Sequence, residues 1–71
     1  MTAEEWIGAF AAEIGVPAPG KEEIEEILRL AGVAAHASER ISAPIACYLV
    51  GISGRPLSEA REVAEGISPT N

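Results

Sequence analysis

The chain has 71 residues, of which 48% are hydrophobic, and a formal net charge of -6 at pH 7. This length predicts a single domain over residues 1–71, which buries only ~60% of the surface of its unfolded form. The acidic balance argues against binding to nucleic acids or to anionic membrane surfaces, because both depend on clustered lysine and arginine.

The single cysteine and the distribution of apolar residues along the sequence predict the cellular location of the protein. Cys47 is the single cysteine, so the chain cannot form an internal disulfide, and we expect this thiol to be buried and inert. No charged segment followed by an apolar one comes after Met1, as a secretory signal would require. The longest apolar run, 45–50, is too short to span a bilayer. We therefore expect a cytoplasmic protein with no membrane contact.

The first predicted element is an amphipathic helix over about residues 2–14. Thr2 and Glu5 have the spacing of a capping box. Apolar residues then recur at intervals of three and four, which places them on one helical face: Ala3, Trp6, Ile7, Phe10 and Ile14. Gly15 ends this helix, and the prolines of residues 16–20 predict a stiff, non-helical connection.

The second predicted helix runs over about residues 21–39. Its first two turns are rich in glutamate, which favours the positive end of a helix dipole. Apolar and small residues form its core stripe: Ile24, Ile27, Leu28, Ala31, Ala34, Ala35 and Ser38.

The third element has two readings, because residues 45–52 are apolar on every side. The run fits a buried strand, but it also fits a helix surrounded by the others. Ser42 followed by Pro44 is typical of a helix start, and a lone strand would lack a hydrogen-bonding partner. We therefore predict a helix over about residues 43–53, capped by Ser42 and buried at the centre of the domain.

The last predicted helix covers about residues 57–66, with Ser58 as its N-cap and a frayed tail at 68–71. The predicted fold is thus an all-α, compact four-helix bundle with the third helix in its middle.

Few residues suit catalysis or metal binding. The chain holds one histidine and one cysteine, and all 11 of its acidic residues are glutamates. A metal centre needs several convergent ligands, and a nucleophilic triad needs an accessible nucleophile beside a base. No glycine-rich phosphate loop is present either. We therefore predict no metal, no cofactor and no enzymatic activity.

One set of basic residues remains a candidate binding site. Arg29, His36 and Arg40 fall on one stripe of the second predicted helix, away from its core face. Arginine and histidine donate hydrogen bonds to carboxylates and phosphates, which suggests a ligand-binding or partner-binding role. The alternative is structural, because cations near a helix C-terminus favour the helix dipole. Trp6 has a similar pair of readings, packing in a core or against a partner, or stacking on a ligand.

The segment AHASERISAPIACYLVGISG, residues 35–54, resembles the central part of a small, uncharacterised all-helical domain family of actinobacteria. The similarity rests mainly on Ala35-His36, Arg40, Ala43-Pro44 and Leu49 with Gly51, and extends to Trp6 and to Leu57 with Ala60. Members of that family occur alone or fused to molybdenum cofactor guanylyltransferases. The resemblance implies a link to molybdenum cofactor biosynthesis or formate dehydrogenase maturation, but no transferase chemistry.

These observations lead to alternative functions. The first is a non-catalytic accessory domain that binds a protein, with a molybdenum cofactor pathway protein as the partner that the resemblance implies. The second is a binder of a small anionic ligand, such as a phosphate or a pterin nucleotide, through His36 and Arg40. Formation of a homodimer is a further alternative, because a small domain gains stability from association.

Overall fold

The computed structural model describes residues 1–67, which form four helices and no strand. They are α1 (Ala3–Ile14), α2 (Lys21–Ala37), α3 (Ser42–Ser53) and α4 (Leu57–Glu65). The all-α class is confirmed, and so is the helical reading of residues 45–52. Each helix bound lies within two residues of the predicted range. The tail expected at 68–71 lies outside the described residues.

Two of the predicted helix ends are confirmed by their hydrogen bonds. The Thr2 hydroxyl accepts from the Glu5 amide at 3.1 Å, and the Glu5 carboxylate accepts from the Thr2 amide at 2.9 Å. Gly15 ends α1 with a φ of 79°, a left-handed conformation that residues with a Cβ adopt only with strain. Both ends of α1 are therefore fixed by contacts within the segment itself.

The predicted serine caps are wrong. Ser42 is the first residue of α3, and its hydroxyl donates to the Ser38 hydroxyl at 3.1 Å instead of accepting from the helix. Ser58 lies inside α4, which begins at Leu57 after Pro56. Proline fixes φ near the helical value, so it orders the chain before α4 without a side-chain cap.

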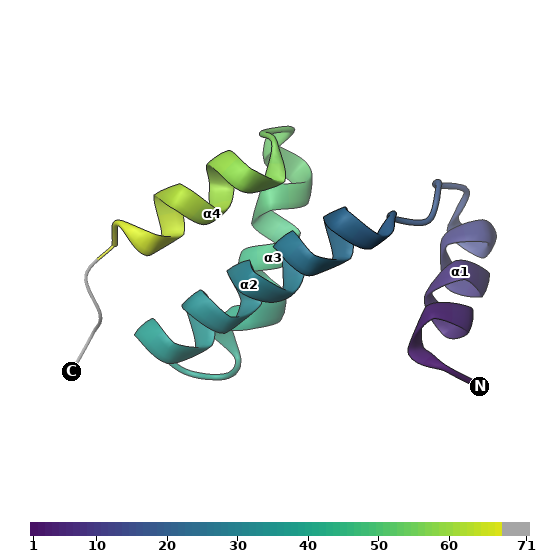
Figure 1. The fold of residues 1–71 in the computed structure, drawn as a ribbon, viewed down its shortest axis with the longest axis horizontal. Coiled ribbons are helices and arrows are strands. Elements are labelled where there is room, and N and C mark those ends of the chain that lie inside the picture. Colours follow the sequence, from purple (N-terminus) through teal and green to yellow (C-terminus); the bar gives the residue numbers. More distant parts are fainter. Residues whose placement is uncertain (68–71) are drawn as a thin grey trace.

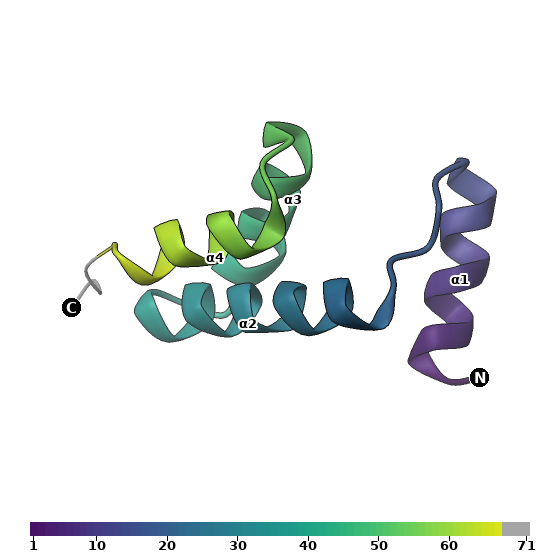
Figure 2. The ribbon, with the colours of Figure 1, turned by 45° about the horizontal axis from the view of Figure 1, so that its top comes forward.

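The helices are arranged around α2, which packs against both α3 and α4. α2 and α4 run in the same direction side by side, while α3 crosses α2 on another side (Figures 1 and 2). α1 stands beyond the N-terminal end of α2, away from α3 and α4, in both views. The linker between α1 and α2 contains Pro17 and Pro19.

The core does not lie where the sequence predicted it. The buried hydrophobic residues of the described chain are Ala11, Leu30 and Ala60, and only Leu30 is large. None belongs to α3, so the prediction that the third helix is buried at the centre is wrong. A helix that is apolar all round is normally enclosed, but here it has other helices along one side only. The central helix is α2.

Candidate functional site

The three predicted basic residues do not form one stripe. Arg29 and His36 lie on α2, but α2 ends at Ala37, so Arg40 belongs to the turn before α3. All three side chains are exposed. Within residues 1–67, none of the three makes a side-chain hydrogen bond or an ion pair. His36 lies in the last turn of α2, where a cation favours the dipole.

Arg29 and His36 border different depressions of the surface. Arg29 lies at one between the first turns of α2 and of α4, with a volume of about 740 Å³. His36 lies at another, formed with Ala64 and Ile67 near the C-terminal ends of the same two helices. The structure therefore does not bring the predicted basic residues together around one pocket.

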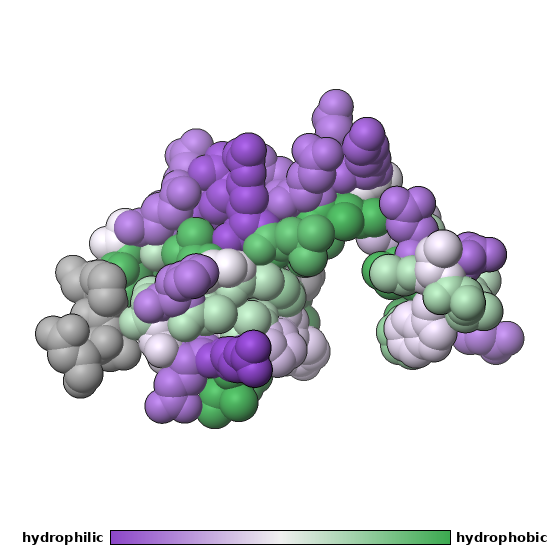
Figure 3. Space-filling view, turned by 60° about the horizontal axis from the view of Figure 1, so that its bottom comes forward, coloured by the Kyte–Doolittle hydropathy of each residue, from purple (hydrophilic) through white to green (hydrophobic). Residues whose placement is uncertain are grey.

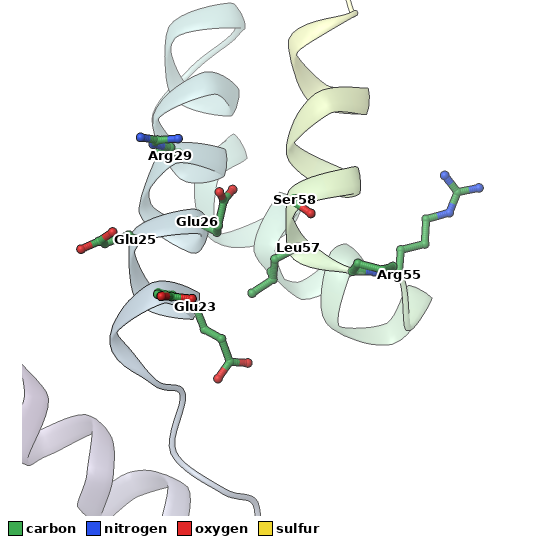
Figure 4. A pocket seen from close by; sticks show the side chains of 9 residues that line it. Glu23, Glu25, Glu26, Arg29, Arg55, Leu57 and Ser58 are labelled. Carbon is green, nitrogen blue, oxygen red and sulfur yellow. The ribbon is translucent and has the colours of Figure 1, made fainter.

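The depression beside Arg29 is acidic (Figure 4). Its wall holds four glutamates of α2 and two arginines, Arg29 and Arg55. Glu26 points toward the space between α2 and α4, whereas Glu25 points outward from α2 (Figure 4). An excess of carboxylates disfavours an anion there by Coulomb repulsion. In residues 1–67, no group of three or more histidine, cysteine, aspartate or glutamate side chains has the arrangement of a metal site.

Arg61 is an important residue that sequence reasoning missed. Its Nε donates to Glu26 Oε2 at 2.6 Å, and its Nη1 donates to Glu65 Oε1 at 3.0 Å. The side chain is 18% exposed, and the hydrogen bond to Glu26 is the main cause that raises the pKa of Arg61. Arg61 thus joins α4 to α2. The spacing to Glu65 is visible in the sequence, but the partner 35 residues away is not.

The most unusual part of the surface is apolar. On α1, an α1 stripe of Trp6, Phe10 and Ile14 is 56%, 50% and 57% exposed. The rings of Trp6 and Phe10 stack, with centroids 5.1 Å apart and an interplanar angle of 18°. These aromatic side chains therefore pack on each other in the open, so Trp6 is not a core residue of this chain.

A second apolar stripe runs along α3, on the side that faces away from α2. This α3 stripe consists of Ile41, Ile45, Tyr48 and Ile52, each between 57% and 67% exposed. At 100° per residue the four positions fall within an arc of about 60°. Large exposed apolar groups gathered on one face mark interaction surfaces more often than isolated ones do.

The opposite side of α3 carries smaller residues. Ala43, Ala46, Cys47 and Val50 are half-buried on it. Cys47 is therefore not fully buried as the sequence suggested, although partial burial raises the pKa of its thiol. α3 thus turns its smaller side chains inward and its larger ones to solvent. This is the reverse of the usual arrangement in a domain that functions alone.

Two hollows of the surface have apolar walls. A groove of about 440 Å³ lies between α3 and α4, and its wall is mainly alanine, valine, leucine and isoleucine. A space-filling view also shows an open hollow between α1 and the remaining helices, bordered by hydrophobic side chains (Figure 3). Apolar side chains are therefore exposed on α1, on α3 and in the groove between α3 and α4.

Comparison with known proteins gives a family but no function. The family described as a domain of unknown function (DUF6457) matches residues 1–68. This bears out the resemblance to an uncharacterised helical family in its broad form. No match was found among curated proteins or among solved structures. Across residues 1–67, no helix has both the length and the apolar character needed to cross a membrane.

Proposed function

The chain belongs to this family of domains of unknown function, DUF6457, and we propose that it is a non-catalytic protein-interaction domain. The observation that carries the proposal is the reversed arrangement of α3. Its stripe of three isoleucines and a tyrosine lies in solvent, while its smaller residues face α2. Exposed aromatic and aliphatic side chains of this kind are the groups that anchor protein interfaces.

The α1 stripe supports the same proposal. Trp6 is the single tryptophan of the chain and lies beside Phe10 on a helix that contributes little to the core. Tryptophan is enriched among the residues that dominate binding energy, because it buries a large area at little cost in side-chain entropy. The two stripes together offer a partner both an aromatic anchor and a broad aliphatic surface.

A finer proposal concerns the partner. The resemblance of residues 35–54 to actinobacterial domains found alone or fused to molybdenum cofactor guanylyltransferases supports a partner in molybdenum cofactor biosynthesis or formate dehydrogenase maturation, and hence a cytoplasmic role. The exposed apolar surface of the two stripes is compatible with such a partner.

The test is affinity capture from the native host with matched variants. We expect the tagged chain to enrich a molybdenum cofactor pathway protein, and the variants Phe10→Glu and Tyr48→Glu to lose it. Ala12→Glu is the control, because Ala12 is exposed on the face of α1 opposite to Phe10. Equal capture by all the variants would contradict the proposal.

A thermal-shift screen tests the alternative of a small anionic ligand. A ligand that binds only the native state raises the melting temperature by mass action. Under the interaction proposal, saturating phosphate, nucleotides and pterins leave the melting temperature unchanged. A shift that is abolished in both His36→Ala and Arg40→Ala would instead favour the small-ligand function.

A further inference from the structure

We propose that the partner of these stripes is a second copy of the chain. In this homodimer the α1 stripe of each copy packs on the α3 stripe of the other copy, so the same contact forms twice. The inference rests on the proposed role as a protein-interaction domain and specifies its first partner. The exposed area of the chain, the two stripes, the distribution of charge and the position of α1 support this homodimer.

The surface of the isolated chain is too large for its mass. A folded monomer of 7.4 kDa is expected to expose about 4,200 Å². This chain exposes 5537 Å², which is roughly 1,000 Å² or more in excess. Two copies that each cover this excess bury about 2,000 Å² in total, which is the range of obligate homodimers.

The helices that carry the two stripes have the same length. α1 and α3 each have 12 residues, so each is about 18 Å long. The α1 stripe presents two stacked aromatic rings and Ile14, and the α3 stripe presents three isoleucines and Tyr48. A twofold axis uses both stripes of both copies at once.

The charge distribution allows two copies with a net charge of -6 to approach through these faces. The glutamates lie on α1, α2 and α4 and in the turn after α2, whereas α3 contains no charged residue. The electrostatic repulsion between the net charges of two such copies is long-range, and salt screens it. Because α3 adds no charge to its contact with α1, salt screens the remaining repulsion and the dimer tightens, rather than weakens, as the salt concentration rises.

The attachment of α1 points it away from its own α3. Ile7, which lies next to the α1 stripe, forms a small depression with Pro19 of the linker and Ile24 of α2. Ala11, next to it on the same side, is 5% exposed. Proline restricts the backbone of the linker, and α1 stands apart from α3 and α4 (Figure 2), with its stripe exposed. In this position α1 can contact a second molecule.

Disulfide cross-linking tests the contact directly. In a Cys47→Ser background, one chain carries Phe10→Cys, and a second chain with a tag of different mass carries Tyr48→Cys. We expect the mixture to oxidise to a covalent dimer of the two chains. Replacing Phe10→Cys by Ala12→Cys moves the thiol to the opposite face of α1 and abolishes the cross-link.

Disulfide cross-linking also distinguishes this dimer from a monomer in which α1 folds onto its own α3. A single chain with Phe10→Cys and Tyr48→Cys forms an intermolecular disulfide if the proposal holds. Oxidation of this double variant to a monomer with an internal disulfide overturns the proposal, as does failure of the mixed chains to cross-link.

Sedimentation of the unmodified chain from low micromolar to submillimolar concentration supplies the second test. We expect a dimer, and we expect Phe10→Glu and Tyr48→Glu to raise its dissociation constant by at least about 100-fold, with Ala12→Glu unchanged. Circular dichroism checks that each variant stays helical. A monomer at every concentration overturns the dimer, whereas the capture experiment described above then still tests the proposed interaction function separately.

Discussion

Truncation of Leu30 is the sharpest test of where the core lies. Within residues 1–67, Leu30, at 2% exposed, is the only large side chain that is fully buried. It lies where α2 meets α3 and α4, beside the apolar groove between those two helices. Leu30→Ala removes this side chain and leaves the charge unchanged. Alanine has a helix propensity at least as high as that of leucine, so the change does not weaken the helix itself.

The expected loss follows from the burial. Leucine-to-alanine changes in cores cost about 2.7–5.0 kcal/mol, and the lower end applies where the site can relax. The open groove beside Leu30 allows such relaxation, so we expect about 3 kcal/mol. The whole domain is expected to have a free energy of unfolding of only about 4–10 kcal/mol. A fall in the melting temperature of about 12–24 °C should result.

Urea unfolding followed by circular dichroism measures this difference at one fixed protein concentration. Leu28→Ala is the matched control, because it makes the same chemical change on the same helix at a side chain that is 65% exposed. We expect the control to cost less than about 1 kcal/mol. Equal losses for the two variants would refute the assignment of Leu30 to the core.

Four further predictions concern polar groups. Thr2→Ala removes the α1 cap and costs about 1 kcal/mol. The hydrogen bonds from Thr2 lower the pKa of Glu5 below 4.5, so this carboxylate stabilises α1 at neutral pH and the effect is lost as the pH falls through the lowered value. Circular dichroism of Glu5→Gln should show a weaker acid dependence. Arg61→Ala leaves Glu26 unpaired and lowers the urea midpoint, and Arg61→Lys restores it only in part because lysine lacks the planar fork. The raised pKa of Cys47 predicts slow alkylation by iodoacetamide at pH 7–8, faster in urea.

The helices were predictable because their ends are set by local chemistry. The capping box at Thr2, Gly15 and the prolines before α2 and α4 act within a few residues, so they can be recognised in the sequence alone. The predicted caps at Ser42 and Ser58 failed because a competing local contact, or a preceding proline, ordered the same turn.

The arrangement of the helices was not predictable in the same way. An apolar run shows that α3 needs to be covered, but hydropathy does not say whether its own chain or another molecule covers it. The pair of Arg61 with Glu26 depends on the parallel packing of α2 and α4, which no local pattern encodes. The stripe of Arg29, His36 and Arg40 assumed a longer α2, and the end of that helix at Ala37 removed Arg40 from it.

The reversed arrangement of α3 also bears on how the chain tolerates mutation. In most domains, exposed positions accept polar residues and buried ones do not. If the exposed stripe is an interface, a saturation library should show the opposite order along this helix. Ile45 and Tyr48 would then reject charged residues more strongly than the half-buried Ala43 rejects serine. Solvent exposure measured on one copy would rank these positions in the wrong order, and designs intended to improve solubility should leave this face unchanged.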